Sequence, residues 1–440
     1  MHPYPASIAI QPLPSPPFGT VTVPGSKSIT NRALVLAALC SRNGPCTLTG
    51  MLRSDDTEVM LDCLGKLGFR TSADWTTNTV IVHRNESDRI IPASSADLFV
   101  GNSGTTVRFL AAMLALGDGR YRLDGVPRMR ERPIQDLLDA LQQLGVKAVS
   151  EAGTGCPPVM IESSGIRGPG AVIRGETSSQ FVSALLMVAP FHEADTHGFG
   201  IKVAGETVSE PYIRMTEAMM LQWNSTWRYD TDQRVYRFDL DSLAHYSSPS
   251  YYPIEPDASS ASYFFAAAAI TGGTVTVRGM KRDMLQGDVK FVDCLQAMGC
   301  TVTELADGIG VQGGPLRGID VDMNAISDTV MTLAAVACFA DGPTTIRNVA
   351  HIRHKETDRI AAVATELRKL GVEVEEYPDG LRITPKPLTG CAVDTYDDHR
   401  MAMSLALVGL KVPGVVVNDP GCVAKTYPGF WDDFARLDGS

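Results

Sequence analysis

Positively charged side chains recur where apolar stretches of the sequence begin, a pattern that could hold small anions. Cations stand at or near the beginnings of predicted helices at Lys27, Arg32, Arg132, Lys355, Arg359, Arg400 and Lys425. The helix dipole already makes an N-terminus positive, so each cation there is unfavourable by about 0.3–1 kcal/mol. Free N–H groups and cations together bind phosphate or carboxylate well, so we expect anionic ligands to compensate.

These seven cations would repel one another if they faced a single cleft. Close like charges cost roughly 1–4 kcal/mol per pair, depending on the local dielectric. The protein itself is acidic, with 39 Lys and Arg against 50 Asp and Glu and a net charge of -11. We therefore expect the empty cleft to open and polyanionic ligands to close it.

Each motif also has a plain structural interpretation. Residues 25–28 (GSKS) lack the full phosphate-loop pattern, and alone they are typical of a helix cap with a solvated lysine. Residues 102–106 alone fit a turn and a cap, and residues 355–359 fit an ion-paired helix start. Residues 397–400 (DDHR) have no second cluster with metal-ligand spacing, so no metal site is predicted. No G-x-S-x-G elbow is present, and no G-x-G-x-x-G leads from a predicted strand into a predicted helix, which disfavours serine hydrolases and dinucleotide oxidoreductases.

The elements that must position these side chains repeat with a period of roughly 70–80 residues. Small polar residues suited to N-capping precede Ala-, Leu-, Val- and Met-rich runs, which predicts buried helices at 26–39, 102–116, 178–190, 257–270, 327–340 and 397–410. More amphipathic segments alternate with them, at 54–71, 131–149, 209–223, 287–303, 355–376 and 424–439. Short stretches between Gly and Pro predict strands.

Length and composition predict a folded protein of more than one domain. The chain has 440 residues, of which 44% are apolar and 20% charged. Six repeats fit two domains of three, with chain crossings near 24–26 and in the Ser-, Tyr- and Pro-rich segment 239–260. The acidic charge argues against nucleic acid and anionic membranes as partners. Without an apolar run of about 18 residues or a secretory leader pattern, and with nine cysteines mostly in apolar runs, we expect a cytoplasmic protein with reduced core thiols.

Taken together, the motifs closely resemble those of the EPSP synthase (3-phosphoshikimate 1-carboxyvinyltransferase) family of enolpyruvyl transferases. The resemblance extends from about Gly19 to Phe430 and is carried, in the family's order, by PGSKSITNR, GNSGTTVR, RMRERPI, SSQF, SEPYI, DASSASYF, KETDR, DDHRMAM and AKTYPGF. It implies an α/β (α+β) fold, a two-lobed inside-out α/β barrel in which each lobe has three βαβαββ repeats around buried helices. One lobe would be residues 26–256 and the other residues 1–25 plus 257–440, with the substrates in the interlobe cleft.

The resemblance also implies site residues for two anionic substrates. The family's 3-phosphoshikimate site corresponds to Lys27, Ser28, Arg32, Ser178, Ser179, Gln180, Ser209, Tyr212, Asp328, His351 and Lys355. Its phosphoenolpyruvate site corresponds to Lys27, Asn102, Gly104, Arg132, Gln180, Arg359, Arg400 and Lys425. The family's reaction moves the carboxyvinyl group of phosphoenolpyruvate to the 5-hydroxyl of 3-phosphoshikimate and releases phosphate, by addition and elimination through a tetrahedral ketal phosphate.

That reaction needs a base for the 5-hydroxyl proton and an acid for the methylene carbon, with roles reversed in elimination. Asp328 is the candidate partner of the hydroxyl, and Lys27 and Glu356 are the candidates for proton delivery. The cations would hold two phosphates and two carboxylates and screen their repulsion. No cofactor or metal is implied, and we expect a monomer whose partners are its small anionic substrates.

Two positions depart from the family pattern. His351 stands where many members have Asn, which makes a contact with the shikimate ring a candidate for pH dependence. Phe109 follows Arg108 where one subgroup has Pro, which changes the packing behind Gly104. Gly104 itself is retained, which is compatible with inhibition by glyphosate.

Two other functions remain open from the sequence. The first is the enolpyruvyl transferase that acts on UDP-N-acetylglucosamine, which shares the fold but typically uses a loop cysteine and a Lys-Asn opening motif. This chain has SKSITNR instead and no cysteine in the region around Arg132. The second is a non-catalytic sugar-phosphate-binding protein, although a pure binder would not need Asp328 and Glu356.

Overall fold

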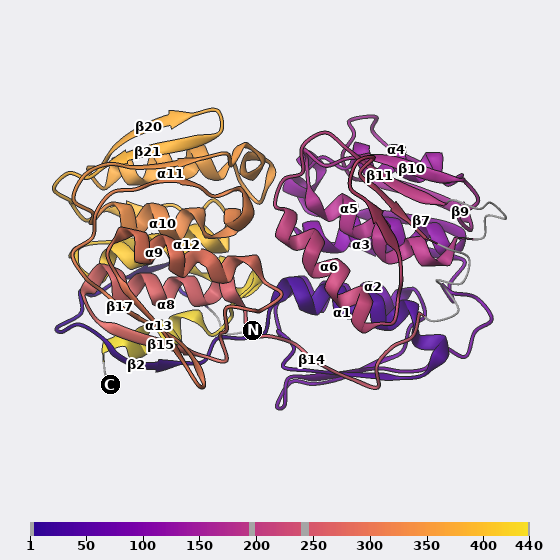
Figure 1. Ribbon diagram of the computed structural model, residues 1–440, viewed down its shortest axis with the longest axis horizontal. Helices are drawn as coiled ribbons and strands as arrows, with labels where there is room; N and C mark the ends of the chain where they lie inside the picture. The colour runs from indigo at the N-terminus through magenta and orange to yellow at the C-terminus, as the bar shows by residue number, and fades with distance from the viewer. Residues whose placement is uncertain (1–3, 193–198, 239–245, 439–440) are drawn as a thin grey trace. The chain divides into compact units, whose positions relative to one another are not determined.

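The computed structural model describes residues 4–192, 199–238 and 246–438. The chain divides into two compact units, one made of Met1–Pro24 with Glu255–Ser440 and the other of Gly25–Ile254. Here the first is called unit 1 and the second unit 2, and each is traced in Figure 1 by its colours. Residues 239–245 of the predicted linker segment, and residue 439 of the last predicted helix, lie outside the described residues.

Unit 2 contains three repeats of the order β-α-β-α-β-β. The central repeat comprises β6 (Ser95–Phe99), α3 (Gly104–Met113), β7 (Asp118–Asp124), α4 (Gln135–Gln143), β8 (Lys147–Ser150) and β9 (Val159–Ser164). Its sheet has the strand order β6-β7-β9-β8, in which β6 and β7 are parallel and the other two pairings are antiparallel. The next repeat comprises β10 (Gly170–Arg174), α5 (Ser179–Val188), β11 (Gly200–Ala204), α6 (Glu210–Gln222), β12 (Arg228–Asp230) and β13 (Val235–Arg237).

The remaining repeat of unit 2 takes its first strand from the far end of the unit. It comprises α1 (Lys27–Leu39), β3 (Cys46–Thr49), α2 (Asp55–Lys66), β4 (Thr71–Asp74) and β5 (Thr79–Val82), together with β14 (Tyr251–Pro253). Strand β14 pairs in parallel with β3, so the sheet order β14-β3-β5-β4 matches that of the other two repeats. The pairing of β14 with β3 thereby joins the two ends of the unit in one sheet.

The first two repeats of unit 1 follow the same plan, whereas the sheet of the third has only three strands. The unit takes its first strand from the N-terminal part of the chain. Its first repeat comprises β2 (Phe18–Val21), α8 (Ala258–Thr271), β15 (Thr274–Arg278), α9 (Phe291–Met298), β16 (Thr301–Leu305) and β17 (Gly308–Gln312). The second comprises β18 (Asp320–Asp322), α10 (Val330–Ala337), β19 (Thr344–Arg347), α11 (Arg359–Lys369), β20 (Glu373–Tyr377) and β21 (Gly380–Thr384). The third comprises β22 (Ala392–Val393), α12 (His399–Gly409), β23 (Val416–Asn418) and α13 (Phe430–Ala435), and β1 (Ser7–Ala9) pairs antiparallel with β23. The order of its three strands is β1-β23-β22.

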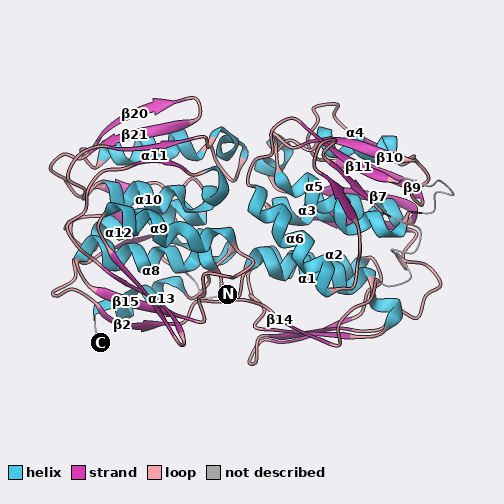
Figure 2. Cartoon of the chain, viewed as in Figure 1, coloured by secondary structure: helices cyan, strands magenta, loops and turns pink. Residues whose placement is uncertain are grey.

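Helices of the more apolar set form the interior of each unit, as the sequence predicts. Every residue of α8 from Ala258 to Ile270 is buried, and α10 is buried throughout. The sheets lie outside these helices, so the units have helical cores (Figure 2). The predicted inside-out α/β architecture is therefore confirmed.

Polar N-caps begin five of the six buried helices, as the sequence predicts. The cap residues whose side chains accept from helix N–H groups are Ser26, Ser103, Ser178, Asp257 and Asp398. Helix α10 is the exception, because residues 324–329 form a 3₁₀ turn and the α-helix begins only at Val330. Asp328 therefore lies in a tight turn and not in the first turn of the α-helix predicted from Ser327.

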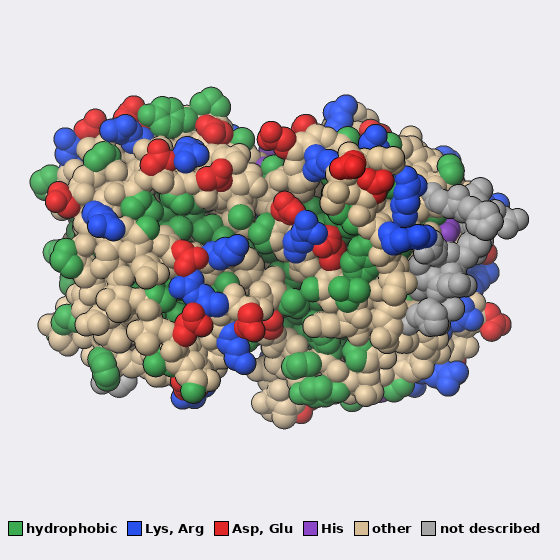
Figure 3. Space-filling view, viewed as in Figure 1, with side chains coloured by type: hydrophobic (Ala, Val, Ile, Leu, Met, Phe, Trp, Pro, Cys, Tyr) green, Lys and Arg blue, Asp and Glu red, His purple; other side chains and the backbone are tan. Residues whose placement is uncertain are grey.

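The distribution of surface charges and the state of the cysteines agree with what the composition predicts. Acidic and basic side chains are interspersed on the face shown in Figure 3. All nine cysteines are free, and seven of them are buried. No helix in the described parts of the chain is long and apolar enough to cross a membrane.

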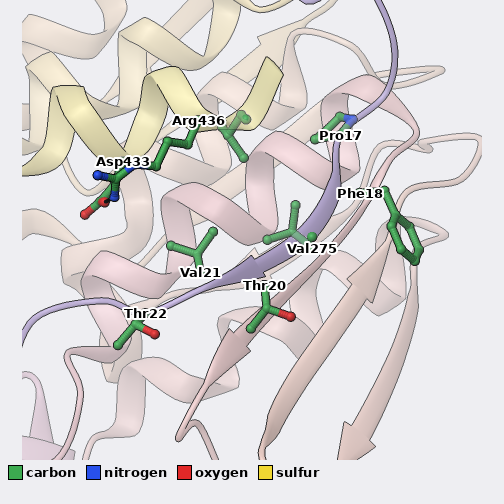
Figure 4. A pocket seen from close by; sticks show the side chains of 10 residues that line it. Pro17, Phe18, Thr20, Val21, Thr22, Val275, Asp433 and Arg436 are labelled. Carbon is green, nitrogen blue, oxygen red and sulfur yellow. Dashed lines mark hydrogen bonds and ion pairs between the residues drawn. The ribbon is translucent and has the colours of Figure 1, made fainter. Parts of the chain in front are cut away.

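A cavity of about 280 Å³ lies in unit 1 beside the edge strand β2. Figure 4 shows its lining, with Phe18 at the rim and the ion pair between Arg436 and Asp433 on the opposite side. The cavity contains none of the cations singled out in the sequence. It is therefore not the predicted anion site.

We predict that Gly409→Ala destabilises unit 1. A Cβ added at Gly409, the last residue of α12, would lie 2.5 Å from the Cβ of Ile10, which packs on this helix. Overpacking of this kind costs roughly 1–3 kcal/mol, measured as a lower midpoint in denaturant. The control is Gly65→Ala in α2, where nothing lies within 4 Å of the added Cβ, so removing a helical glycine should stabilise by about 0.5–1 kcal/mol. Equal midpoints for the two variants would contradict the packing of the N-terminal segment on α12.

Candidate active site

The charged residues predicted in unit 1 meet around the side chain of Arg359, the first residue of α11. Its Nε donates to Asp398 Oδ2 at 2.8 Å, and its Nη1 donates to Asp328 Oδ1 at 3.1 Å. Its Nη2 donates to Glu356 Oε2 at 2.8 Å and to Asp398 Oδ1 at 3.2 Å. Burial alone would lower the pKa of Arg359, but these three carboxylates raise it above its usual value, so the guanidinium is permanently charged.

Asp328 is held by three cations, two from the segment 355–359 and one from α12. Arg400 Nη2 lies 2.7 Å from its Oδ2, and Lys355 Nζ lies 3.8 Å from the Oδ1 that also receives Arg359. Lys425 joins the same cluster through Glu356, with 4.0 Å between Nζ and Oε1. A carboxylate in these surroundings is oriented by several charged donors at once, which suits a group that must accept a proton at a fixed place.

Short turns at helix starts bring these residues together. Helix α10 packs against α12 and α11. A 3₁₀ turn directly precedes α10, and short non-helical segments precede α11 and α12. Asp398, fully buried, caps α12 by accepting from the N–H of Arg400 at 3.0 Å while it binds Arg359. The sequence predicts that negative groups should compensate the cations at helix starts, and in unit 1 the chain itself supplies three of them.

Two acidic residues of this cluster were not singled out from the sequence. Asp398 belongs to the polar start of the helix predicted at 397–410, and this capping position also places it beside Arg359. Asp288, fully buried, accepts a hydrogen bond from Ser259. Burial, with the nearby charge of Asp328, raises the pKa of Asp288 to about 6. No sequence signal separates Asp288 from an ordinary surface aspartate.

His351 lies in the turn before Lys355 and is buried. Burial, followed by the positive charge of Lys355, lowers its pKa to about 3. The imidazole is therefore neutral at every pH near neutrality. A contact made by His351 would not titrate there, so the structure gives no basis for the expected pH dependence.

In unit 2, Arg32 of α1 lies inside the packed helices with 1% of its surface exposed. Its guanidinium donates to oxygens of Thr216, Ser28, Ser183 and Tyr212. Of the predicted residues, Arg32 therefore brings Ser28 and Tyr212 together. Ser183 and Thr216, which support it, were not predicted, because single hydroxyls inside apolar helices give no distinct pattern.

Arg132 is set against the start of α3 in the same unit. Its Nη1 donates to the carbonyl oxygen of Asn102 at 2.9 Å and to Oδ1 of Asn102 at 3.3 Å. A Cβ added at Gly104 would lie 2.8 Å from the Arg132 Cζ. The absence of a side chain at Gly104 is thus what lets the guanidinium lie over the beginning of this helix.

Gln180, in the first turn of α5, is fixed by α3. Its Oε1 accepts from Arg108 Nη1 at 2.6 Å, and its Nε2 donates to Thr105 Oγ1 at 3.1 Å. The hydroxyl of Ser178 caps α5 by accepting from the Gln180 N–H at 3.2 Å. Arg108, the last residue of the GNSGTTVR motif, is a further charged residue in contact with a predicted site residue, and it is absent from the predicted set.

The other residues predicted in unit 2 also lie at helix starts. Lys27, the first residue of α1, lies 3.6 Å from Asp56 Oδ2 through its Nζ. Ser179 is the first residue of α5, and Ser209 precedes α6 in a left-handed conformation with φ of 51°. A non-glycine residue with this φ is uncommon, and such positions occur often at functional sites.

The predicted residues thus fall into two sets, one in each unit. Asp328, His351, Lys355, Glu356, Arg359, Arg400 and Lys425 lie in unit 1, and Lys27, Ser28, Arg32, Asn102, Gly104, Arg132, Ser178, Ser179, Gln180, Ser209 and Tyr212 lie in unit 2. The structure joins Asp328, Lys355, Glu356, Arg359, Arg400 and Lys425 in one network. In the described parts of the chain, no group of three or more His, Cys, Asp or Glu side chains could hold a metal ion.

The fold is that of the enolpyruvyl transferases. A solved structure of an EPSP synthase from Acinetobacter baumannii superposes with a TM-score of 0.79 at 24% identity, covering 98% of this chain and 97% of that one. The enolpyruvyl transferase NikO from Streptomyces tendae superposes with a TM-score of 0.75 at 18% identity, with 98% of both chains covered. At these identities the likeness defines the class of fold.

Sequence comparison resolves the family within that class. The EPSP synthase (3-phosphoshikimate 1-carboxyvinyltransferase) family model matches residues 14–434. A 3-phosphoshikimate 1-carboxyvinyltransferase of Nostoc punctiforme is 47% identical over 432 residues, which is 98% of this chain and 99% of the relative. One from Burkholderia orbicola is 48% identical over 427 residues, covering 95% and 96%. The chain belongs to the EPSP synthase family, as its motifs predict.

We predict that His351 makes stability fall on acidification. Its pKa is about 3 in the folded protein and about 6.5 in an unfolded chain, so the unfolded state binds more protons between these values. The contribution of the neutral imidazole is complete above about pH 6.5 and is lost as the pH falls toward 3. The melting temperature should therefore drop less steeply from pH 6.5 to 4.5 in His351→Asn than in the parent. Parallel curves for the two proteins would show that His351 is not buried as described.

Proposed function

We propose that this chain transfers the carboxyvinyl group of phosphoenolpyruvate to the 5-hydroxyl of 3-phosphoshikimate and releases phosphate, a step in the shikimate pathway to chorismate and the aromatic amino acids. The observation that carries the proposal is that Asp328 forms ion pairs with Lys355, Arg359 and Arg400. It combines a carboxylate that can accept a hydroxyl proton with cations that can bind anionic substrates. Membership of the EPSP synthase family supports the choice of substrates.

The two substrates are assigned to separate sets of residues. In the proposal, 3-phosphoshikimate contacts Lys27, Ser28, Arg32, Ser178, Ser179, Gln180, Ser209, Tyr212, Asp328, His351 and Lys355. Phosphoenolpyruvate contacts Lys27, Asn102, Gly104, Arg132, Gln180, Arg359, Arg400 and Lys425. Support comes from the chemistry of these groups, which are mostly cations, hydroxyls and backbone N–H groups at helix starts.

The chemical steps use few groups. Asp328 takes the proton of the 5-hydroxyl as that oxygen attacks C2 of phosphoenolpyruvate, and Lys27 or Glu356 protonates the methylene carbon. A tetrahedral ketal phosphate results. In the second step a proton leaves the methyl group, the C–O bond to phosphate breaks, and the carboxyvinyl ether and phosphate form. The reaction is redox-neutral, so these groups balance it without a cofactor.

The residues assigned to the two substrates are divided between the two units. We propose that residues 1–25 with 257–440 and residues 26–256 act as two domains that bind the same pair of substrates. The cations of unit 1 are already paired with carboxylates, so an arriving phosphate or carboxylate would exchange partners with them. We further propose that the chain acts in the cytoplasm as a monomer.

Neither alternative is favoured. The family model is that of EPSP synthases, and the UDP-N-acetylglucosamine enzyme's typical loop cysteine has no counterpart around Arg132. A pure sugar-phosphate binder would have no use for a carboxylate held ready among three cations.

We predict that phosphate release from phosphoenolpyruvate requires 3-phosphoshikimate and depends on Asp328. Asp328→Asn keeps the shape of the side chain but removes the base, so kcat should fall roughly 10²–10⁴-fold. Binding of 3-phosphoshikimate, followed by calorimetry, should change much less. The control is Asp62→Asn, a surface partner of Lys66, which should leave activity unchanged.

Three results would decide against this assignment. Full activity in Asp328→Asn would remove Asp328 from the mechanism. Phosphate release that depends on UDP-N-acetylglucosamine would favour the first alternative. Binding of 3-phosphoshikimate without any phosphate release by the parent protein would favour the second.

We predict that Gly104→Ala weakens the binding of phosphoenolpyruvate more than that of 3-phosphoshikimate. The added Cβ would overlap the guanidinium of Arg132 and push it from the start of α3. Hydrogen bonds to charged groups contribute about 1.5–3 kcal/mol, so KM for phosphoenolpyruvate should rise roughly ten- to hundredfold. Gly65→Ala, which meets nothing, serves as the control. An equal rise in both KM values would place Arg132 elsewhere than at phosphoenolpyruvate.

A further inference from the structure

Arg32 differs from Arg359 and Arg400 of unit 1 in having no negative partner. Its Nε donates to Thr216 Oγ1 at 2.7 Å, and its Nη1 donates to the Ser28 carbonyl at 2.9 Å. Its Nη2 donates to Ser183 Oγ at 3.3 Å and to the Tyr212 carbonyl at 3.1 Å. All four acceptors are neutral, and within residues 4–192, 199–238 and 246–438 no carboxylate forms an ion pair with Arg32.

Burying an unpaired charge is costly, so the protein must stabilise this guanidinium in another way. Arg359, equally buried, is stabilised by three carboxylates. Burial lowers the pKa of Arg32 to about 10, which still leaves it charged at neutral pH. A cation without a resident counter-ion can offer its whole charge to an arriving anion, because no carboxylate has to be displaced.

Two aromatic rings supply part of the stabilisation. The Cζ of Arg32 lies 5.0 Å from the centre of the Phe109 ring and 6.0 Å from the centre of the Tyr212 ring. Phe109, in α3, is fully buried. The negative face of an aromatic ring attracts a cation, and the attraction is stronger when water is excluded.

The hydrogen bonds fix the plane of the guanidinium as well. Thr216 Oγ1 lies 2.9 Å from Ser183 Oγ, so the two hydroxyls that receive Arg32 also support each other across α5 and α6. Arginine has five N–H groups, and four are engaged by these bonds. One N–H on Nη1 has no partner among the described residues and is available to a ligand.

We propose that Phe109 and Thr216 are positioning residues that hold Arg32 as a counter-ion-free cation for a negatively charged group of 3-phosphoshikimate. The inference rests on the proposed function and deepens it. The face of the Phe109 ring takes the place that a carboxylate partner would have, and it stabilises the positive charge of Arg32 without neutralising it. Thr216 fixes the Nε edge, so the guanidinium meets the ligand in one orientation.

The test compares four variants of the full chain with the parent. Phe109→Leu removes the ring but keeps an apolar side chain, and Phe109→Tyr restores an aromatic face. Thr216→Val removes the hydroxyl with little change of shape. Phe291→Leu in α9 is the matched control, because Phe291 is equally buried and makes no cation–π contact within the described parts of the chain.

The dissociation constant of 3-phosphoshikimate, KM for phosphoenolpyruvate and the melting temperature are measured for each protein. We expect Phe109→Leu and Thr216→Val each to weaken 3-phosphoshikimate binding roughly three- to thirtyfold, with KM for phosphoenolpyruvate changed less than twofold. Phe109→Tyr should recover most of the loss. Phe291→Leu should lower the melting temperature and leave both ligands unaffected.

Several outcomes would overturn the inference. If Phe109→Leu lowers only the melting temperature, as Phe291→Leu does, the ring is an ordinary core residue. If both substrates weaken equally, the ring does not act through Arg32. Should Phe109→Leu fail to fold, Thr216→Val decides alone, and unchanged 3-phosphoshikimate binding in it counts against the inference. A parent protein that does not bind 3-phosphoshikimate would overturn the proposed function and this inference together, whereas normal parent binding with unaffected variants would overturn this inference only.

Discussion

Buried arginine is the constraint around which both units are arranged. A guanidinium cannot give up its proton at ordinary pH, so each one placed away from water must be met by acceptors in fixed positions. Arg359 and Arg32 are each 1% exposed, and the turns and helix starts around them are arranged to supply those acceptors. The 3₁₀ turn that carries Asp328 and the cap residue Asp398 both supply acceptors to Arg359.

The repeated fold explains how such acceptors can be gathered. Each βαβαββ repeat buries one helix, and burial of the helix brings its polar cap inside as well. The two roles coincide at Asp398, which accepts from the Arg400 N–H and binds Arg359. Helix caps at a protein surface are exposed to water, whereas the buried cap Asp398 is also part of a charged cluster.

The two units solve the problem of a buried cation differently. Unit 1 interleaves carboxylates with its cations, so the cluster is nearly balanced before any ligand arrives. Unit 2 surrounds Arg32 with hydroxyls, carbonyls and rings, which stabilise the charge and leave it uncompensated. In the proposed reaction, this difference places the proton-accepting carboxylate in unit 1 and an unshared positive charge in unit 2.

The sequence by itself determined the repeats, the buried helices with their polar starts, and the identity of most charged residues in the clusters. These follow from periodicity and capping, which act over a few residues and are therefore readable in the chain. Only the tertiary structure decided which charges are neutralised. Asp398 accepts a hydrogen bond from Arg359, and Asp288 accepts one from Ser259, and both partners are distant in sequence. Phe109 lies against Arg32 because α1 packs on α3. Such contacts depend on how helices cross, and no local pattern encodes the partner of a buried charge.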